Sequence, residues 1–390
     1  MSATKKIVLG VLALVVLALG ITGVVIYPKA RQEWSAPLGP SLGLPTYTPT
    51  LLLSPPTSPA LSNTAAPAVT QSLSTSAPAL TLPTQSPAPL ASQQTATPAP
   101  LCGGPPVMLV LAVGVDSGLD YNYGLSDAIR IVRVDFTIPK ISVLSMPRDL
   151  WVKIPDLVNP YGIDHGKLNQ AFFYGGPGMG YYKGPGGGPG LLARTLDENF
   201  GLRVDHYGAV NMQTFVKIVD AVGGIDVYLP TDVDGRPIDA TTADMGYFYA
   251  GHHHFTGDMA LRFSRIRKKY NDFTRMDNQN IVLCALKKKI TSPDVLPKIP
   301  QIIGAFKDSV LTDLSPEQLS QLACLAPKLK RENLLFTSLP QEIFTQSRVF
   351  SPQQKNQTFV LDADFNVIRD YISQFVAGTW PSEPSEPTCP

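Results

Sequence analysis

The feature that most limits how this chain can fold is a long segment without charge. No residue between Glu33 and Asp116 carries a charged side chain, and from Ser35 to Pro100 the sequence is mainly Pro, Ser, Thr, Ala and Leu. Such a composition buries too little apolar surface to offset the entropy lost on ordering, and its prolines favour extended conformations. We therefore predict that residues 28–101 form a disordered linker and that the folded region follows it.

A second uncharged segment lies at the N-terminus. Lys5 and Lys6 precede an apolar run from Ile7 to Tyr27. As a helix this run would be about 30 Å long, which matches the hydrocarbon core of a bilayer. A cleaved signal peptide would have a shorter apolar core and a small-residue cleavage site. We predict a cytoplasmic tail at 1–6, a transmembrane helix at 7–27 and a single-pass protein whose large C-terminal region is extracytoplasmic.

Apolar runs of strand length interleave with helical patterns after Cys102. This alternation predicts an α/β domain built in layers. The expected strands are residues 107–115, 129–134, 141–146 and 225–229, and the expected helices are residues 191–199 and 214–222.

Length and composition set the expected boundaries. Residues 102–290 suffice for one sizeable core. We assign 291–378 to a C-terminal extension packed on that domain and the Pro/Ser/Glu-rich residues 379–390 to a mobile tail. The net charge of +1 gives no global field that would attract nucleic acid, so we expect no nucleic-acid partner.

Four cysteines all follow the apolar N-terminal run: Cys102, Cys284, Cys324 and Cys389. Their even number and the lack of a Cys-x-x-Cys pair are consistent with disulfides in an oxidising compartment. Three pairings are possible. Our working hypothesis pairs Cys102 with Cys389, which would join the domain's ends, and Cys284 with Cys324.

Two carboxylates lie where strands are expected to end or begin. Asp116 ends the first apolar strand, and Ser126-Asp127 leads into the next. Ligands of α/β sheets lie at strand ends, and Mg2+ is typically held by one or two carboxylates together with water and phosphate oxygens. Each Asp taken alone could equally cap a turn.

Basic residues gather in two further places. Arg148 and Asp149 follow the third strand, and a dense cluster runs from Arg262 to Gln279. Arginine matches phosphate oxygens with two parallel donors. A solvated basic face is the simpler interpretation of the cluster alone. Several arginines and a metal around one anion would instead form a diphosphate site.

Six motifs occur in an order that resembles a known family: Val113–Asp116, Leu125–Asp127, Leu144–Asp149, His165–Phe172, Val219–Val227 and Ala260–Arg267, followed by Asp272, Arg275 and Gln279. Over about residues 107–290 the chain resembles the LytR–CpsA–Psr family of cell-wall ligases. The resemblance implies an α/β/α layered domain with a mixed central sheet and a hydrophobic tunnel for a polyprenyl chain.

The resemblance also implies an activity at the bacterial cell membrane. Such enzymes move a glycopolymer from a polyprenyl-diphosphate carrier to peptidoglycan and form a phosphodiester. By position, Asp116 and Asp127 would bind Mg2+, Asp272 would take the proton of the acceptor hydroxyl, and Asp149 is the alternative base. Phosphate oxygens would be held by Arg148, Arg265, Arg267, Arg275 and Gln279, with Arg148 also acting in catalysis.

Two positions depart from the family pattern. Leu125 and Asn278 stand where the family usually has arginine. Arg130, Arg262 or Lys268 would have to replace the missing contacts. Two other functions therefore stay open: a hydrolase that cleaves polyprenyl diphosphates with water, and a membrane-tethered module that binds lipid-linked wall precursors without turnover.

Overall fold

The computed structural model describes residues 31–44, 99–118, 120–267, 269–298, 301–302, 306, 309–351 and 353–381. The predicted transmembrane helix at 7–27 and most of the predicted linker lie outside these residues. Within the described part of the chain, no helix combines the length and the apolar character needed to cross a membrane.

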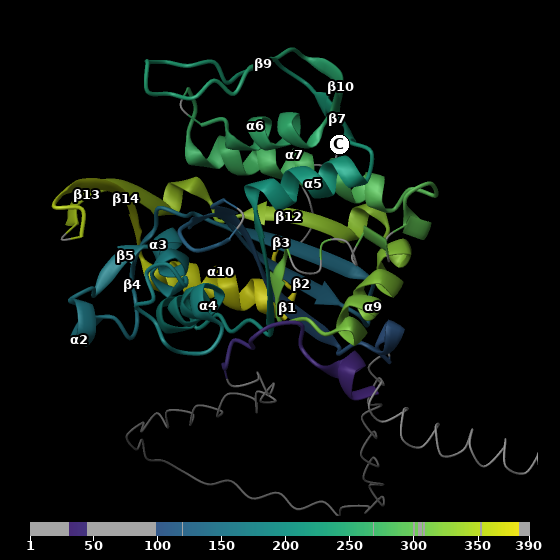
Figure 1. The fold of residues 1–390 in the computed structure, drawn as a ribbon, viewed down its shortest axis with the longest axis horizontal. Coiled ribbons are helices and arrows are strands. Elements are labelled where there is room, and N and C mark those ends of the chain that lie inside the picture. Colours follow the sequence, from purple (N-terminus) through teal and green to yellow (C-terminus); the bar gives the residue numbers. More distant parts are fainter. Residues whose placement is uncertain are drawn as a thin grey trace, which may run out of the picture. The chain divides into compact units, whose positions relative to one another are not determined.

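The core of the fold is a six-stranded mixed sheet. The pairs β1–β6 and β3–β12 are parallel, whereas β1–β2, β2–β3 and β6–β11 are antiparallel. Figure 1 shows this sheet at the centre of the domain. In spatial order its strands are β11 (Leu311–Thr312), β6 (His206–Asn211), β1 (Val107–Asp116), β2 (Leu125–Asp135), β3 (Lys140–Met146) and β12 (Leu334–Ser338).

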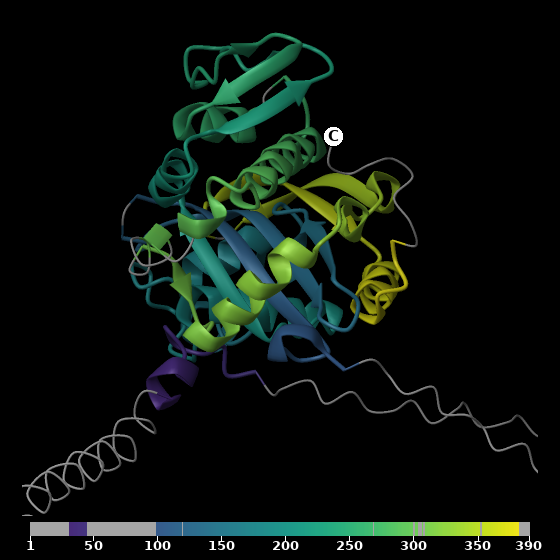
Figure 2. The same cartoon turned by 90° about the vertical axis from the view of Figure 1, so that its right-hand side faces the viewer.

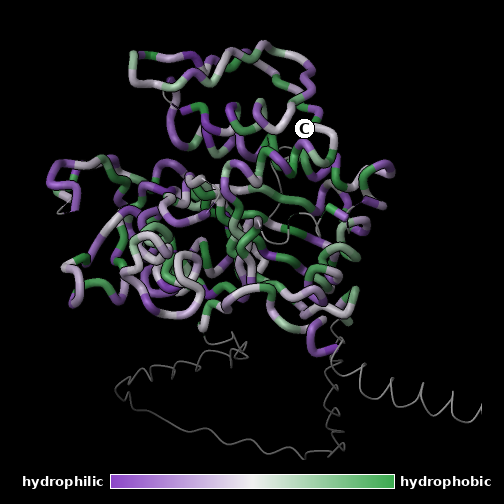
Figure 3. Tube along the Cα trace, viewed as in Figure 1, coloured by the Kyte–Doolittle hydropathy of each residue, from purple (hydrophilic) through white to green (hydrophobic). Residues whose placement is uncertain are grey.

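Strand β1 has apolar residues on both of its faces because helices cover the sheet from two sides. Leu109 and Leu111 belong to the largest hydrophobic cluster, whereas Met108 and Val110 point into a second cluster on the opposite face. Figure 3 shows hydrophobic residues concentrated along the central strands. Because both faces of β1 are buried, its sequence is an unbroken apolar run.

Helices form the outer layers, and Figure 2 shows α9 lying across one face of the sheet. Helices α3, α4 and α10 belong to the cluster on the other face. The helices are α2 (Val158–Tyr161), α3 (Leu168–Gly175), α4 (Gly187–Phe200), α5 (Met212–Ala221), α6 (Gly257–Arg265), α7 (Asp272–Ile290), α9 (Pro316–Leu325) and α10 (Phe365–Ala377), with short 3-10 turns η1 (Leu101–Gly103), η2 (Leu296–Lys298), η3 (Ala326–Lys328), η4 (Arg331–Asn333) and η5 (Gln341–Ile343).

The described residues also form four two-stranded sheets. One of them, β7–β10, packs with α5, α6 and α7 around a separate hydrophobic cluster that contains Phe255 and Phe263. The four pairs are β4 (Trp151–Lys153) with β5 (His165–Lys167), β7 (Ile225–Leu229) with β10 (Gly251–Phe255), β8 (Val233–Asp234) with β9 (Tyr247–Phe248), and β13 (Phe344–Ser351) with β14 (Asn356–Ala363).

The predicted α/β class, mixed sheet and local elements are confirmed, since every expected strand and helix overlaps an observed one. Residues after 290 do more than pack on the domain. They supply β11 and β12, the two edge strands of the central sheet, as well as α9 and α10 in its outer layers.

Two predicted boundaries are wrong. Part of the predicted linker, residues 38–44, packs on the domain: Leu42 is buried in the main core and Pro40 O accepts a hydrogen bond from Tyr207 Oη at 3.1 Å. The predicted mobile tail begins with ordered residues, because the Trp380 ring lies edge-on against Tyr371 at 5.0 Å. A few apolar side chains within proline-rich sequence, Leu42 and Leu44 in the first segment and Trp380 in the second, anchor both segments.

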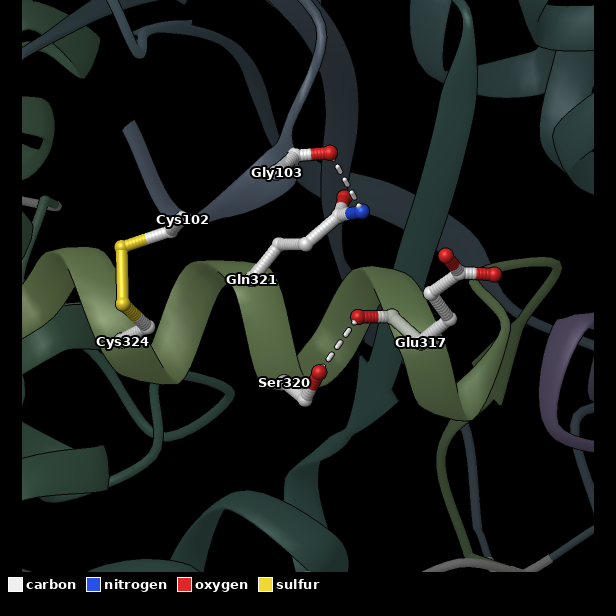
Figure 4. The surroundings of a disulfide bond; sticks show 6 residues. All are labelled: Cys102, Gly103, Glu317, Ser320, Gln321 and Cys324. Atoms are coloured by element: carbon white, nitrogen blue, oxygen red, sulfur yellow. Dashed lines mark hydrogen bonds between the residues drawn. A yellow bond between two sulfur atoms is a disulfide. The ribbon is translucent and has the colours of Figure 1, made fainter. Parts of the chain in front are cut away.

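The hypothesis for the disulfides is also wrong. Cys102 in η1 is bonded to Cys324 in α9, and Figure 4 shows the two segments side by side, with Gln321 Nε2 donating a hydrogen bond to Gly103 O at 3.0 Å. Cys284 is part of a disulfide as well. The cause is tertiary, because α9 lies on the sheet face next to the start of β1.

We expect the Cys102–Cys324 bond to stabilise the domain strongly, since it closes a loop with a sequence separation of 222 residues. The double variant Cys102→Ser/Cys324→Ser should lose about 2–5 kcal/mol of unfolding free energy, because its unfolded chain is less constrained. Urea unfolding under non-reducing conditions measures this loss. An unchanged midpoint and slope would contradict the prediction.

Candidate functional site

The two predicted metal carboxylates lie at neighbouring strand ends. Asp116 is the exposed last residue of β1. The register between β1 and β2 shifts there: Gly114 pairs with Ala128 and Val115 pairs with Ser126, which leaves Asp127 without a partner in β1. A bulge of this kind turns a side chain out of the regular alternation. It explains how Asp127 comes to line the same pocket as Asp116.

Arg148 follows β3 and is only 7% exposed. Its Nη1 lies 2.6 Å from Asp127 Oδ1, and its Nε lies 3.4 Å from Asp149 Oδ2 and 3.6 Å from Asp272 Oδ1. One guanidinium therefore joins three carboxylates that come from β2, the β3–β4 connection and α7. Asp149 is also paired with Lys167, whose Nζ lies 2.8 Å from its Oδ1.

The basic cluster follows the end of α6 and the start of α7. Arg265 is the last residue of α6, and the extended Ile266 turns inward so that Arg265 and Arg267 both face solvent. The side chain of Asn271 accepts a hydrogen bond from Thr274 N at 2.8 Å and so caps α7, which makes Asp272 its first residue.

Arg275 and Gln279 lie one turn apart on α7, as their spacing predicts. Arg275 Nη2 lies 2.8 Å from Asp272 Oδ1 and donates a hydrogen bond to Asp127 O at 3.0 Å. Gln279 Oε1 accepts a hydrogen bond from Arg130 Nη2 at 2.9 Å. The helix thus holds the strand end of β2 against the basic cluster.

The surroundings of the two candidate bases, Asp272 and Asp149, shift their pKa values in opposite directions. Burial raises the pKa of Asp272 above the ordinary value, although Arg275 and Arg148 oppose part of the rise. Burial also acts to raise the pKa of Asp149, but Arg148 and Lys167 outweigh it and bring that pKa below the ordinary value. Asp272 is therefore the better proton acceptor, and Asp149 is a fixed counter-ion.

The pKa values of Arg148 and Arg275 also depend on burial and on the neighbouring charges. Burial acts to lower the pKa of Arg148, but Asp127, Asp149 and Asp272 outweigh it, so its pKa is raised and its charge is secure. Burial and the charge of Arg148 lower the pKa of Arg275, although Asp272 and Asp127 oppose this.

A first pocket, which we call the basic pocket, has a volume of about 210 Å³. Five basic and three acidic side chains line it, so it carries an excess of positive charge suited to an anion. The charged residues are Asp116, Asp127, Asp234, Arg236, Arg265, Arg267, Lys269 and Arg275, and Gln279 also faces it.

A second pocket, which we call the aromatic pocket, has a volume of about 480 Å³. Asp149 and Asp272 line it together with aromatic residues of α7 and the β13–β14 hairpin. Arg267 lines both pockets, so the two are neighbours on either side of this arginine.

All nine residues that the sequence singled out come together here. Six line the basic pocket: Asp116, Asp127, Arg265, Arg267, Arg275 and Gln279. Asp149 and Asp272 line the aromatic pocket, and Arg148 connects the two sets through its ion pairs.

The carboxylates present suit a magnesium ion. The side chain of Asp116 has no hydrogen-bond or ion-pair partner within the described residues. Asp127 pairs with Arg148 through Oδ1, and its Oδ2 lies 3.9 Å from Arg275 Nη1. Two carboxylates leave most coordination positions to water and to phosphate oxygens, which is the usual arrangement for Mg2+. No group of three or more His, Cys, Asp or Glu residues in the described ranges could hold a metal by itself.

The candidates to replace the two missing arginines behave differently. Arg130 is 5% exposed and donates hydrogen bonds to Gln279, Asn280 Oδ1 (2.8 Å) and Ser145 Oγ, so it supports Gln279 from within the protein. Burial and the charge of Arg275 lower the pKa of Arg130 to about 10. Arg262 pairs instead with Asp258 at 2.8 Å on the surface of α6, and Lys268 lies outside the described residues.

Sequence reasoning assigned no site role to several residues. Lys167 and Asn169 lie in one of the ordered motifs and contact Asp149 and Asp127, so that motif was the available signal. Arg236 reaches the basic pocket from the segment between β8 and β9, held by Asp234 at 2.9 Å. No sequence pattern pointed to it.

A mixed α/β sheet whose strand ends carry paired carboxylates beside convergent arginines forms a site suited to a phosphorylated anion. The LytR_cpsA_psr family model matches residues 104–364. The chain belongs to the LytR_cpsA_psr family.

Named relatives agree with this assignment. Over 215 residues the chain is 32% identical to "Polyisoprenyl-teichoic acid--peptidoglycan teichoic acid transferase TagU" of Oceanobacillus iheyensis, which covers 55% of this chain and 61% of that protein. The TagU of Halalkalibacterium halodurans is 29% identical, and the match covers 60% of this chain and 74% of that protein. The chain thus spans about three fifths of the first of these relatives. The crystal structure of B. subtilis TagV, 23% identical, shares the fold with a TM-score of 0.52, covering 70% of this chain and 97% of that chain.

Proposed function

We propose that this protein transfers a glycopolymer, together with one phosphate, from a polyprenyl-diphosphate carrier to peptidoglycan. The observation that carries the proposal is the basic pocket, in which five basic side chains surround the two candidate metal carboxylates Asp116 and Asp127; this suits a diphosphate bound with a metal ion. The names of the TagU relatives, which state a polyisoprenyl-linked donor and a peptidoglycan acceptor, support it.

The reaction exchanges one P–O bond for another. An acceptor hydroxyl oxygen attacks the phosphorus that carries the glycopolymer, and the bond from that phosphorus to the bridging oxygen breaks. Polyprenyl phosphate leaves with the bridging oxygen, and the glycopolymer is left joined to peptidoglycan through a phosphodiester. Arg265, Arg267 and Arg275 are positioned to neutralise charge on the phosphate oxygens, which is the main source of rate enhancement in phosphoryl transfer.

The proton of the acceptor hydroxyl goes to Asp272 in this proposal. Its raised pKa makes it a stronger base than Asp149. The cations Arg275 and Arg148 approach its Oδ1, and its Oδ2 accepts no hydrogen bond within the described residues. Arg275 and Arg148 keep enough of the carboxylate ionised to accept a proton. Asp149, which is itself paired with Lys167, holds Arg148 in place.

Asp116 and Asp127 would hold Mg2+ at the edge of the basic pocket. A bound Mg2+ would supply positive charge to the two phosphates. Arg148 fixes Asp127 through the 2.6 Å ion pair, so the same carboxylate is oriented before any ligand arrives.

We also propose that the domain works outside the cytoplasm of a bacterial cell, anchored by residues 7–27. The Cys102–Cys324 disulfide supports this, because such bonds persist in oxidising compartments.

Incubating the purified chain with a polyprenyl-diphosphate oligosaccharide, Mg2+ and a soluble peptidoglycan fragment tests the function. We expect a glycan–phosphate–muropeptide adduct by mass spectrometry. Free glycan phosphate without adduct would identify a hydrolase, and binding without any product would identify a non-enzymatic module. Either result would overturn the proposal.

Metal removal gives a separate prediction. Chelation with EDTA should abolish transfer, and Asp116→Asn should raise the Mg2+ concentration for half-maximal rate by at least about tenfold, since one of two protein ligands is lost. Asp370→Asn, an exposed substitution on α10, is the matched control and should behave as the unmodified chain. Equal Mg2+ dependence in both variants would remove Asp116 from the metal site.

A further inference from the structure

We propose that the aromatic pocket and the adjoining face of the β13–β14 hairpin bind the acceptor as an extended glycan strand. This inference rests on the proposed function, which does not say where the acceptor lies. The pocket lies across Arg267 from the basic pocket, and Asp272 is on its wall. An acceptor there would bring its hydroxyl to the proposed base from the side opposite the diphosphate.

The lining of the pocket suits a sugar better than a hydrocarbon chain. Phe273, Phe344 and Phe359 offer ring faces, while Asn271, Gln341 and Gln346 offer amide donors and acceptors. Sugar rings have apolar C–H faces and polar edges, so they need both kinds of group. A polyprenyl tail would leave the amides of Gln341 and Gln346 without partners, which is costly once water is displaced.

The hairpin is fixed to the two chain segments that carry Asp149 and Asp272. Leu361 N of β14 donates a hydrogen bond to Asp149 O at 2.9 Å. The Phe344 ring of β13 lies 5.8 Å from the ring of Phe273, the neighbour of Asp272. Lys167, the partner of Asp149, lies over the Phe359 ring at 5.9 Å. A ligand on this face would therefore be held in register with the reacting groups.

The same face continues beyond the pocket as an open surface. Side chains of a strand alternate between faces, so Phe344 and Gln346 share theirs with Arg348 and Phe350. Arg348 pairs in register with Phe359, which is 37% exposed, and Phe350 is 57% exposed. Figure 1 shows the hairpin projecting from the body of the domain. Alternating rings and polar groups along a projecting ribbon suit a polymer that extends past the site.

Positive charge favours the acceptor over other glycans. Arg348 is exposed and forms no ion pair within the described part of the chain. Peptidoglycan strands carry carboxylates on their peptides, so this arginine would attract them. A neutral glycan would gain only the ring and amide contacts.

The test compares Phe359→Ala and Gln346→Ala with Thr345→Ala in the full chain. Thr345 is exposed on the opposite face of β13 and is the matched control. We expect the first two variants to raise the KM for a soluble peptidoglycan fragment about tenfold, with the donor KM changed less than about twofold. Phe350→Ala, at a more exposed position that does not threaten folding, should raise the acceptor KM in the same direction.

Calorimetric titration with chitotetraose, a β-1,4-linked N-acetylglucosamine oligomer, separates this inference from the proposed function. Weaker binding of chitotetraose by Phe359→Ala and Gln346→Ala supports the glycan site even if the unmodified chain forms no transfer product. Three results overturn the inference: no chitotetraose binding by the unmodified chain, equal binding and acceptor KM in all variants, or a rise confined to the donor KM. The last would mean that the aromatic pocket holds part of the donor.

Discussion

Replacing Arg148 by Ala should abolish glycopolymer transfer, with a loss of at least about 10³-fold in rate. Among the described residues, its guanidinium is the one group that contacts Asp127, Asp149 and Asp272 together. Without this guanidinium, the three carboxylates repel one another, and no shared partner holds Asp127, Asp149 and Asp272 in their relative positions. The loss should appear in the mass-spectrometric transfer assay at saturating donor and Mg2+.

Stability must be measured with activity, because removing one partner of a buried ion pair costs about 3–5 kcal/mol. Arg148→Lys keeps the charge and should melt near the unmodified protein, yet a single ammonium cannot span the three carboxylates, so transfer should still fall sharply. Arg262→Ala, which removes an exposed pair with Asp258, is the matched control and should keep full activity. Full activity in Arg148→Ala would mean that the chemistry occurs elsewhere.

Individual strands and helices could be predicted from the sequence where burial of the strand or a stop signal at the helix end determines their bounds. The buried β1 needs a continuous apolar run, and Gly223-Gly224 ends a helix, so both were found with nearly correct bounds. Sheet membership could not be found in the same way. Residues 225–229 form a strand as expected, but it pairs with β10 outside the central sheet, because a short alternating pattern does not identify its partner.

The site residues were found because ordered motifs mark them, whereas their arrangement depends on tertiary contacts. A register shift between β1 and β2 redirects the side chain of Asp127, and no residue in the sequence predicts that shift. Arg130 looks like one of several available cations in the sequence, but the structure buries it behind Gln279. Phe359 and Gln346 lie far along the chain from every motif, in a hairpin whose position is fixed by its bond to Asp149 O.

Replacing Asp272 by Asn should lower transfer by about 10²- to 10⁴-fold, the usual contribution of a general base. Asn keeps the shape of the side chain at the start of α7 but cannot accept the proton. Donor binding should persist, since the lining of the basic pocket is unchanged. The kcat of the variant and the Kd for the donor, measured separately, distinguish a lost base from a lost binding group.

The pH profile gives the sharper test. Because burial raises the pKa of Asp272, its base form is lost as pH falls through a value above that of an ordinary Asp, and transfer should decline there. Asp272→Asn should remove this acidic limb along with most of the rate. Asp149→Asn should keep the limb, since the pKa of Asp149 is lowered and it stays ionised across the same range. If Asp149→Asn lost the acidic limb and Asp272→Asn retained it, the two carboxylates would exchange roles, and Asp272 would be the counter-ion that holds Arg148 and Arg275.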